Sequence, residues 1–248
     1  MGRRKAGPRD QRPTIVFLHG TRLTGASWAA QVADLADEFH CLAPDLPGHG
    51  TAADVPFTLA GAAERIAGLI AAEAHGGRAI LVGLSLGGYV AMDVAARWPD
   101  RVRGLVISGA TAEPVGARAY AYRGLALVFR RTPARPLERV NRWFIGRRFP
   151  AQIAEPILAA GFSFAGGETA LRMLVGERFV PRLAAYPGPT LILNGEYDLF
   201  FRPTEAAFVA AAVDARRVVI RGATHLANLD RPAAFSAAIR RFARSIPA

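Results

Sequence analysis

The sequence contains a single cysteine, Cys41, among its 248 residues. One cysteine excludes an intramolecular disulfide and a cysteine-based metal site. Because Cys41 lies in an apolar stretch, we expect it to be a small buried hydrophobe. Long hydrophobic runs are also missing, since the longest clean ones, 79–82 and 124–129, are far shorter than the roughly 20 residues of a membrane span. We therefore expect no membrane span.

Lysine is almost absent, since Lys5 is the only one among 31 basic residues. A protein selected for positive charge alone would use lysine as well as arginine. The skew indicates a compositional bias, so the formal net charge of +11 is weak support for a nucleic-acid partner. We expect no nucleic-acid binding.

The positive charge is confined to two segments. The tail 1–12 has five basic residues against one acidic residue, and segment 111–185 has twelve arginines against five glutamates, so the rest of the chain is neutral. The start of the chain lacks the apolar core of a signal peptide. We predict a basic, disordered tail over residues 1–12 and a cytoplasmic location.

Short apolar runs alternate with helical patterns, which predicts a mostly parallel sheet of about six strands flanked by helices. The runs are continuous rather than alternating, as in strands covered on both faces. Apolar residues make up 51% of the chain, enough for one large α/β core. The strand-like runs are Thr14–Leu18, Phe39–Ala43, Ala79–Gly83, Arg103–Ser108, Thr190–Asn194 and Arg217–Ile220. The helical patterns lie at about 27–37, 58–75, 86–97, 203–212 and 231–245, the last with Asp230 as N-cap and Pro232 in the first turn.

The alternation stops between residues 111 and 185. This stretch has helical patterns, including Ala119–Arg131 and Pro136–Arg148, and no convincing strand. We therefore divide the chain into an α/β core, 13–110 and 186–248, and an all-helical insertion, 111–185.

The most informative motif is Gly-x-Ser-x-Gly at residues 83–87, between a strand-like run and a helical pattern. In a nucleophile elbow the serine occupies a strained turn, and glycines let the two backbones approach each other. We therefore predict Ser85 as a nucleophile, with the N–H of Leu86 facing the space beside its hydroxyl.

Serine is a weak nucleophile at neutral pH and needs a base. His225 follows the last strand-like run, where a loop brings it to the edge at which open α/β sheets bind ligands. Asp198 follows another strand-like run and is our choice for the acid that orients the base, with Glu196 as its rival. His19, at the end of the first strand, suits a structural role.

These pieces resemble the α/β-hydrolase superfamily over nearly the whole chain. The resemblance rests on His19-Gly20, Trp28, the run from Asp45 to Gly50, the Ser85 elbow and the order Ser85, Asp198, His225. It implies that Thr21 supplies a second oxyanion N–H beside that of Leu86. It also implies that segment 111–185 is a helical cap.

The sequence departs from the family pattern in three places. Only thirteen residues precede the first strand, so the usual N-terminal β-hairpin is expected to be reduced or absent. His225 follows threonine rather than glycine, and Asp230 stands where many relatives have glutamate. None of these changes removes a catalytic atom.

The resemblance implies a serine hydrolase that cleaves a carboxylic ester of a small or medium apolar acyl group without a metal or cofactor. A thioesterase, lactonase, C–C hydrolase or hydroxynitrile lyase would use the same triad. A non-catalytic or slow ligand-binding receptor is the alternative from another class.

The helical insertion should set substrate preference. Its aromatic residues include Trp143, Phe144 and Phe162, which we predict as substrate contacts in an apolar pocket. Its arginines either form a solvated helix face or steer an anionic substrate, such as a carboxylate ester or an acyl group on coenzyme A or an acyl carrier protein. The expected partner is a small-molecule ester, and the oligomeric state is left open.

Overall fold

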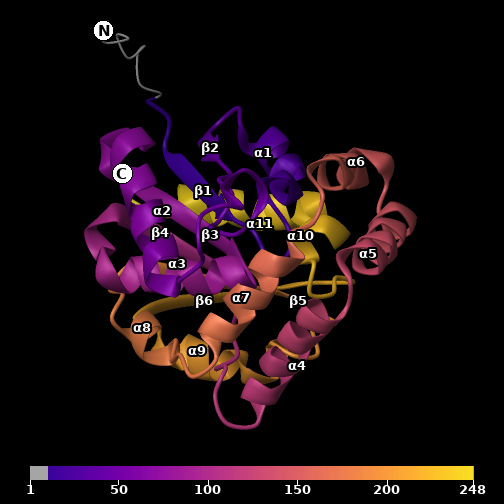
Figure 1. Cartoon of the computed structure of the whole chain (residues 1–248). Helices are drawn as coiled ribbons and strands as arrows, with labels where there is room; N and C mark the ends of the chain where they lie inside the picture. The colour runs from indigo at the N-terminus through magenta and orange to yellow at the C-terminus, as the bar shows by residue number, and fades with distance from the viewer. Residues whose placement is uncertain (1–10, 248) are drawn as a thin grey trace, which may run out of the picture.

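Six parallel strands form one sheet in the order β2-β1-β3-β4-β5-β6, as seen in a computed structural model that describes residues 11–247 (Figure 1). Within these residues every strand pairing is parallel, so the described sheet has no N-terminal hairpin. Most of the tail 1–12 lies outside the described residues, and its disorder stays a prediction. The strands are β1 (Thr14–Leu18), β2 (His40–Leu42), β3 (Ala79–Leu84), β4 (Val102–Ser108), β5 (Pro189–Gly195) and β6 (Asp214–Ile220).

The strands are continuously apolar because the sheet is covered on both faces. In β1, Ile15 and Phe17 belong to one core cluster, while Val16 and Leu18 belong to the other. Successive side chains of a strand point to opposite faces, so both faces need apolar residues. This confirms the parallel α/β sheet predicted from the alternation.

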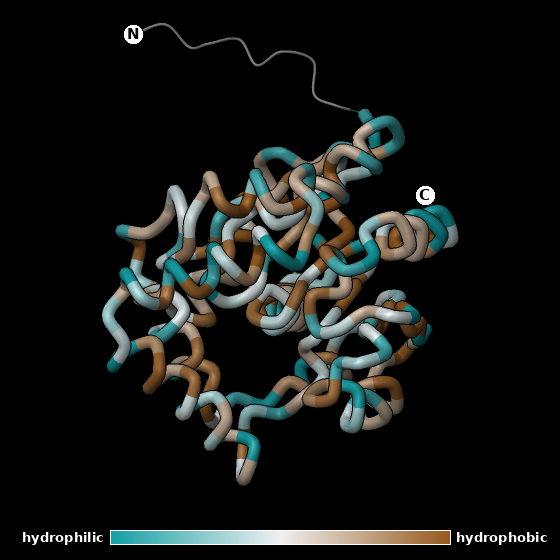
Figure 2. Tube along the Cα trace, turned by 90° about the vertical axis from the view of Figure 1, so that its right-hand side faces the viewer, coloured by the Kyte–Doolittle hydropathy of each residue, from teal (hydrophilic) through white to brown (hydrophobic). Residues whose placement is uncertain are grey.

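Helices from the α/β core cover the two faces. α2 and α3 pack on one face, and α1 and α11 pack on the other with Trp28 and Phe235 between them. In Figure 2 hydrophobic residues concentrate in the interior of the trace, and hydrophilic residues alternate with them along the peripheral helices. These helices are α1 (Ala29–Leu35), α2 (Leu59–Glu73), α3 (Leu86–Arg97), α9 (Glu205–Ala211), α10 (Ala227–Asp230) and α11 (Pro232–Arg244).

The last helix starts one residue later than a cap at Asp230 requires. α11 begins at Pro232, its N-cap residue is Arg231, and Asp230 ends the short helix α10. The predicted first-turn proline is confirmed, but the N-cap assignment of Asp230 is wrong. Its carboxylate instead accepts hydrogen bonds from the backbone N–H and the hydroxyl of Thr224.

Segment 111–185 is helical, as predicted. α4 packs along α7, α5 packs on α6, and α8 packs on α3 of the core. In Figure 1 α4, α5 and α6 lie at the side of the molecule, away from α2. The helices are α4 (Arg118–Arg131), α5 (Ala134–Arg148), α6 (Ala151–Ala160), α7 (Phe164–Leu174) and α8 (Val180–Ala184).

None of the helices in the described part of the chain has the length and apolar character needed to span a bilayer.

Two buried histidines hold the loop that follows β1. His19 Nε2 accepts a hydrogen bond from the backbone N–H of Leu46 at 2.9 Å, and Nδ1 donates to the carbonyl of Gly20 at 3.0 Å. The His49 ring lies 5.0 Å from the His19 ring. Burial, together with the neighbouring His49, lowers the pKa of His19 to about 3. His19 is therefore a neutral structural residue, as its position at the strand end predicted.

Asp45 ties the same loop to a second turn. Its carboxylate accepts hydrogen bonds from the backbone N–H groups of Gly25 and Thr51, both at 2.7 Å, and from the Thr51 hydroxyl. Burial alone would raise the pKa of Asp45, but these hydrogen bonds outweigh it and the pKa is lowered. Asp45 therefore keeps its negative charge, and the hydrogen bonds that depend on it, as the pH falls into the acidic range.

We predict that His19 makes the fold acid-sensitive. The unfolded chain binds a proton at His19 below about pH 6.5, whereas the folded chain does so only near pH 3, so stability falls as pH drops through this window. From pH 7 to pH 5 this lowers the free energy of unfolding by about 2 kcal/mol. His19→Gln keeps a neutral donor and acceptor and should lose this part of the pH dependence, as measured by urea unfolding at both pH values. Parallel profiles for the two proteins would contradict the assignment.

Candidate active site

Ser85 stands at the turn between β3 and α3 with φ 53° and ψ −115°. A positive φ is costly for a residue with a β-carbon, and it persists where surrounding contacts impose it. The Ser85 N–H donates to the carbonyl of Ser108 at 2.8 Å, and its own carbonyl accepts from the N–H of Gly88 at 2.9 Å. The sharp strand-to-helix turn predicted by the Gly-x-Ser-x-Gly motif is therefore present.

The glycines of the motif allow backbones to touch. A β-carbon on Gly87 would lie 2.1 Å from the carbonyl oxygen of Leu18 in β1, and one on Gly83 would lie 2.4 Å from the carbonyl oxygen of Gly87. Both separations are far below van der Waals contact. Only glycine at these two positions lets α3 begin this close to the sheet.

His225 and Asp198 are joined by a hydrogen bond. Nδ1 of His225 lies 2.9 Å from Oδ2 of Asp198, and Asp198 is buried. Since an ionised carboxylate only accepts, Nδ1 is the donor and Nε2 of the neutral ring remains an acceptor. This is the pairing predicted for the base and the acid that orients it.

Packing fixes the imidazole as well. The Phe201 ring stacks on His225 with centroids 5.0 Å apart and planes inclined by 18°. On Gly109, which has φ +55°, a β-carbon would lie 2.5 Å from the His225 ring. Phe201 also donates its backbone N–H to Asp198 Oδ1 at 3.2 Å, so one residue holds both members of the pair.

Glu196 has a different partner from the one a catalytic acid would need. Its Oε2 accepts a hydrogen bond from the backbone N–H of Gly222 at 2.8 Å. Glu196 therefore ties the loop after β5 to the turn after β6, and the structure brings Asp198 rather than Glu196 to His225.

The His225 loop is anchored from the helical segment. Asp230, which accepts two hydrogen bonds from Thr224, also forms an ion pair with Arg148 of α5. Thr224 immediately precedes His225. Thr224 and Asp230 are the two residues at which this part of the sequence departs from the family pattern. The structure shows that they contact each other.

Ser85, Asp198 and His225 line a single cavity of about 520 Å³. The cavity lies at the carboxyl ends of the strands, where the loops after β1, β3, β5 and β6 meet, and α4 and α7 close it from the other side. Its lining consists of 20–23, Leu84, Ser85, Ala121, Tyr122, Leu125, Leu171, 197–201 and 224–226. Groups of three or more side chains that could hold a metal ion do not occur among residues 11–247.

The predicted oxyanion donors lie in different surroundings. Thr21 lines the cavity, and Leu86 is the buried first residue of α3. A β-carbon on Gly20 would lie 3.5 Å from the Ser85 β-carbon, so the loop before Thr21 runs directly beside the serine. The backbone roles of Thr21 and Leu86 stay predictions.

The structure does not bring Trp143, Phe144 and Phe162 into this cavity. Trp143 is 66% exposed and Phe144 is 38% exposed. Phe162 stacks on Phe164 and packs with the α5–α6 cluster. The helix periodicity of α5 indicated an amphipathic element but not which face meets the core.

Other aromatic residues line the cavity instead. Tyr122 comes from α4, and Tyr197, Phe200 and Phe201 come from the loop after β5. The Tyr122 hydroxyl donates to that of Tyr89, because Tyr89 uses its own proton on the Ala112 carbonyl. For Tyr197, Phe200 and Phe201, the signal in the sequence is that they lie within three residues of Asp198.

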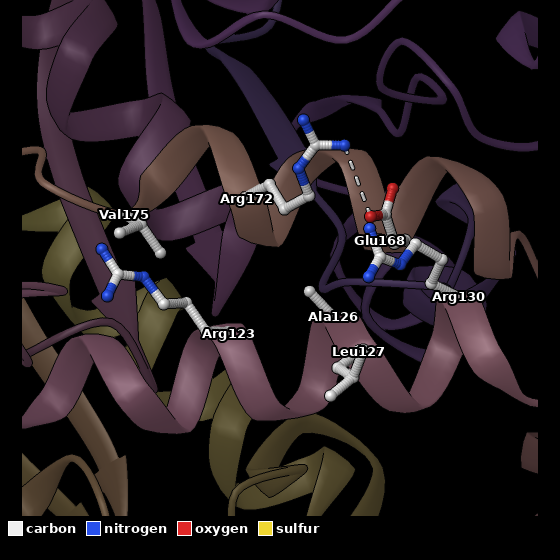
Figure 3. Close-up of a pocket in the computed structure, with 7 residues that line it drawn as sticks. All are labelled: Arg123, Ala126, Leu127, Arg130, Glu168, Arg172 and Val175. Carbon is white, nitrogen blue, oxygen red and sulfur yellow. Dashed lines mark hydrogen bonds and ion pairs between the residues drawn. The ribbon is translucent and has the colours of Figure 1, made fainter.

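A second hollow, of about 400 Å³, lies between α4 and α7 and collects arginines of the helical segment (Figure 3). Arg123 and Arg130 of α4 and Arg172 of α7 line it, and Arg172 forms an ion pair with Glu168 at 3.5 Å. No arginine of segment 111–185 lines the cavity that contains Ser85. The arginines of this hollow and the predicted catalytic residues therefore line different cavities.

Several similar proteins align with nearly the whole chain. The pimeloyl-acyl-carrier-protein methyl ester esterase of Edwardsiella ictaluri is 30% identical over 96% of this chain and 94% of its own. The 2-succinyl-6-hydroxy-2,4-cyclohexadiene-1-carboxylate synthase of Enterobacter sp. is 32% identical over 98% and 96%. The malate-bound structure of a thermophilic esterase from Thermogutta terrifontis superposes with a TM-score of 0.77 at 29% identity, covering 96% of this chain and 92% of that one.

A family match agrees with the fold and the elbow. The model of the alpha/beta hydrolase family matches residues 15–238, which begin at the second residue of β1 and include β2 to β6 and the helical segment. The sheet order, the strained turn at Ser85 and these similarities identify the chain as a member of the alpha/beta hydrolase family and a hydrolytic enzyme.

Proposed function

We propose that the protein is a serine hydrolase that cleaves a carboxylic ester through an acyl-enzyme intermediate. The observation that carries the proposal is the 2.9 Å hydrogen bond from His225 Nδ1 to Asp198 Oδ2 in the cavity that Ser85 also lines. This pairing leaves Nε2 of His225 free to accept a proton, which is the state that a general base requires.

In the proposed first step, His225 Nε2 takes the proton of Ser85 as Oγ attacks the ester carbonyl carbon. The carbonyl oxygen becomes an oxyanion, and the backbone N–H groups of Thr21 and Leu86 donate hydrogen bonds to it. Asp198 stabilises the imidazolium. The tetrahedral intermediate then collapses, His225 gives the proton to the departing alkoxide, and an alcohol leaves.

In the second half of the proposed reaction, a water molecule enters the place that the alcohol has left. His225 takes a proton from water, and the resulting nucleophile attacks the acyl-serine carbonyl. Collapse of this intermediate returns the proton to Ser85 Oγ and releases the carboxylic acid. These steps need no electron donor or metal ion.

We assign segment 111–185 as a cap that shapes the acyl site. Ala121, Tyr122 and Leu125 of α4 and Leu171 of α7 line the cavity opposite Ser85. With the aromatic loop after β5, they make most of the walls apolar, which favours a small or medium acyl group. One relative is named for a methyl ester on an acyl carrier protein, so a carrier-bound acyl group falls within the proposed substrate class.

Active-site labelling tests the nucleophile. A fluorophosphonate should label wild type rapidly at Ser85, label Ser85→Ala not at all, and label His225→Ala at least about 100-fold more slowly, because the base is gone. His75→Ala, which removes an exposed histidine outside the cavity, should react like wild type. Intact-protein mass spectrometry measures the adduct. An unlabelled wild type that ligands nevertheless stabilise would support the receptor alternative.

The choice of acid is tested by two amide variants. Asp198→Asn should lower kcat for a p-nitrophenyl ester by roughly 10³- to 10⁴-fold, because the amide favours the wrong histidine tautomer. Glu196→Gln, two residues away, should leave kcat within about threefold, because its carboxylate accepts a hydrogen bond from Gly222 whereas His225 bonds to Asp198. Equal losses in both variants would show that loop geometry, rather than the carboxylate at 198, controls the rate.

A further inference from the structure

Arg22 is the one lysine or arginine among the residues that line the Ser85 cavity. It follows Thr21 in the loop after β1 and is half-buried. Thus a permanent positive charge lies in the same cavity as the proposed nucleophile. The mechanism above gives Arg22 no role, since neither proton transfer nor the predicted oxyanion site requires a cation there.

The guanidinium is held in place on one side only. Its Nε donates to Oδ1 of Asn141 in α5 at 2.7 Å, and Asn141 in turn donates from Nδ2 to the Leu137 carbonyl at 2.8 Å. This second bond fixes which end of the Asn141 amide faces the arginine. Within residues 11–247, the two terminal nitrogens of Arg22 make no hydrogen bond, and no carboxylate forms an ion pair with it.

Some partly buried arginines have acidic partners, whereas Arg101 and Arg103 donate to backbone carbonyls. Arg182 pairs with Asp93 and Glu177, and Arg240 pairs with Glu38. Arg22 differs, and burial without an offsetting carboxylate lowers the pKa of its guanidinium. A half-buried cation costs free energy unless an anion or hydrogen-bond acceptor compensates it.

The backbone at Arg22 is also in an unfavourable conformation. Its φ is 62°, a conformation that glycine adopts easily but that is strained for a residue with a β-carbon. Its carbonyl accepts a hydrogen bond from the N–H of Ser163 at 2.9 Å, which holds this conformation. The loop shape alone would suit glycine better, so the side chain needs an explanation of its own.

We propose that Arg22 is an anion subsite for a free carboxylate on the substrate. The preferred substrate is then an ester that also carries an ionised carboxyl group, such as the half-ester of a dicarboxylic acid. The two free terminal nitrogens offer the planar fork that binds a carboxylate through paired hydrogen bonds.

Both ends of such a substrate would lie in one cavity. Gly20 is adjacent to Ser85, and the backbone of Arg22 is two residues further on, at most about 7 Å along the chain. The Arg22 side chain extends beyond its backbone to Asn141 of α5, so we expect an acyl chain of several methylene groups to place its carbonyl at Ser85 and its carboxylate at Arg22. The apolar walls described above would cover the methylene groups between them.

This inference rests on the proposed ester hydrolysis, and a matched pair of substrates tests it. The two substrates are the mono-p-nitrophenyl ester of adipic acid and p-nitrophenyl hexanoate. Their acyl groups have the same length, but one ends in a carboxylate and the other in a methyl group. Wild type should favour the adipate ester in kcat/KM. Arg22→Gln should lower kcat/KM for the adipate ester by roughly 30- to 100-fold, mainly through KM, and change that for the hexanoate less than twofold.

Two further variants separate charge from shape. Arg22→Lys keeps the charge but loses the fork, so it should retain an intermediate preference for the adipate ester. Arg123→Gln, which removes an arginine from the second hollow between α4 and α7 (Figure 3), should behave like wild type on both esters. Equal losses on both esters in Arg22→Gln would overturn the proposal and make Arg22 a residue that only shapes the loop.

Binding to the inactive Ser85→Ala variant provides a test that does not depend on turnover. Adipate should raise its Tm more than hexanoate does, and Arg22→Gln in the same background should abolish the difference. No difference between the two acids would overturn the inference, even if Ser85 reacts with a fluorophosphonate. A difference in Tm alongside an unreactive Ser85 would instead keep the anion subsite and reject ester hydrolysis.

Discussion

The site depends on a contact between backbones. Gly87, in the first turn of α3, lies so close to the Leu18 carbonyl of β1 that no side chain fits between them, and Gly83 meets Gly87 in the same way. This contact holds the helix against the sheet and imposes the strained conformation of Ser85. The Ser85 side chain in this turn lines the cavity, while Leu84 and Leu86 on either side of it are buried.

The other site residues reach Ser85 because the strands are parallel. The carboxyl ends of β1, β3, β5 and β6 share one edge, so loops from distant parts of the chain converge there. Asp198 and His225 come from the loops after β5 and β6, and Arg22 comes from the loop after β1. The helical segment then adds α4 and α7 above this edge, which explains why the loops after four strands and an insertion line one cavity.

Positive charge has two separate locations in this protein. Several arginines of segment 111–185 line the hollow between α4 and α7, where Arg172 is paired with Glu168. Two others, Arg148 and Arg182, pair with Asp230 and Asp93 of the core. The cation of the Ser85 cavity is Arg22, which belongs to the neutral core rather than to the basic segment. Net charge is therefore a poor guide to the electrostatics of the site, because a single half-buried arginine without a carboxylate acts more strongly than several solvated ones.

The amino-acid sequence alone predicts the parallel sheet, its strands to within about three residues, and the choice of Ser85, Asp198 and His225 as candidates. These features are local: apolar runs define strands, and the glycines around Ser85 report a close backbone approach. Side-chain partners are not local. Asp230 looked like a helix cap but binds Thr224, Trp143 looked like a pocket residue but is exposed, and Arg22 carried no recognisable pattern. These contacts are visible only in the folded protein, because hydrogen-bond partners and pocket walls come from residues that are distant in the chain and meet when the strands and helices pack.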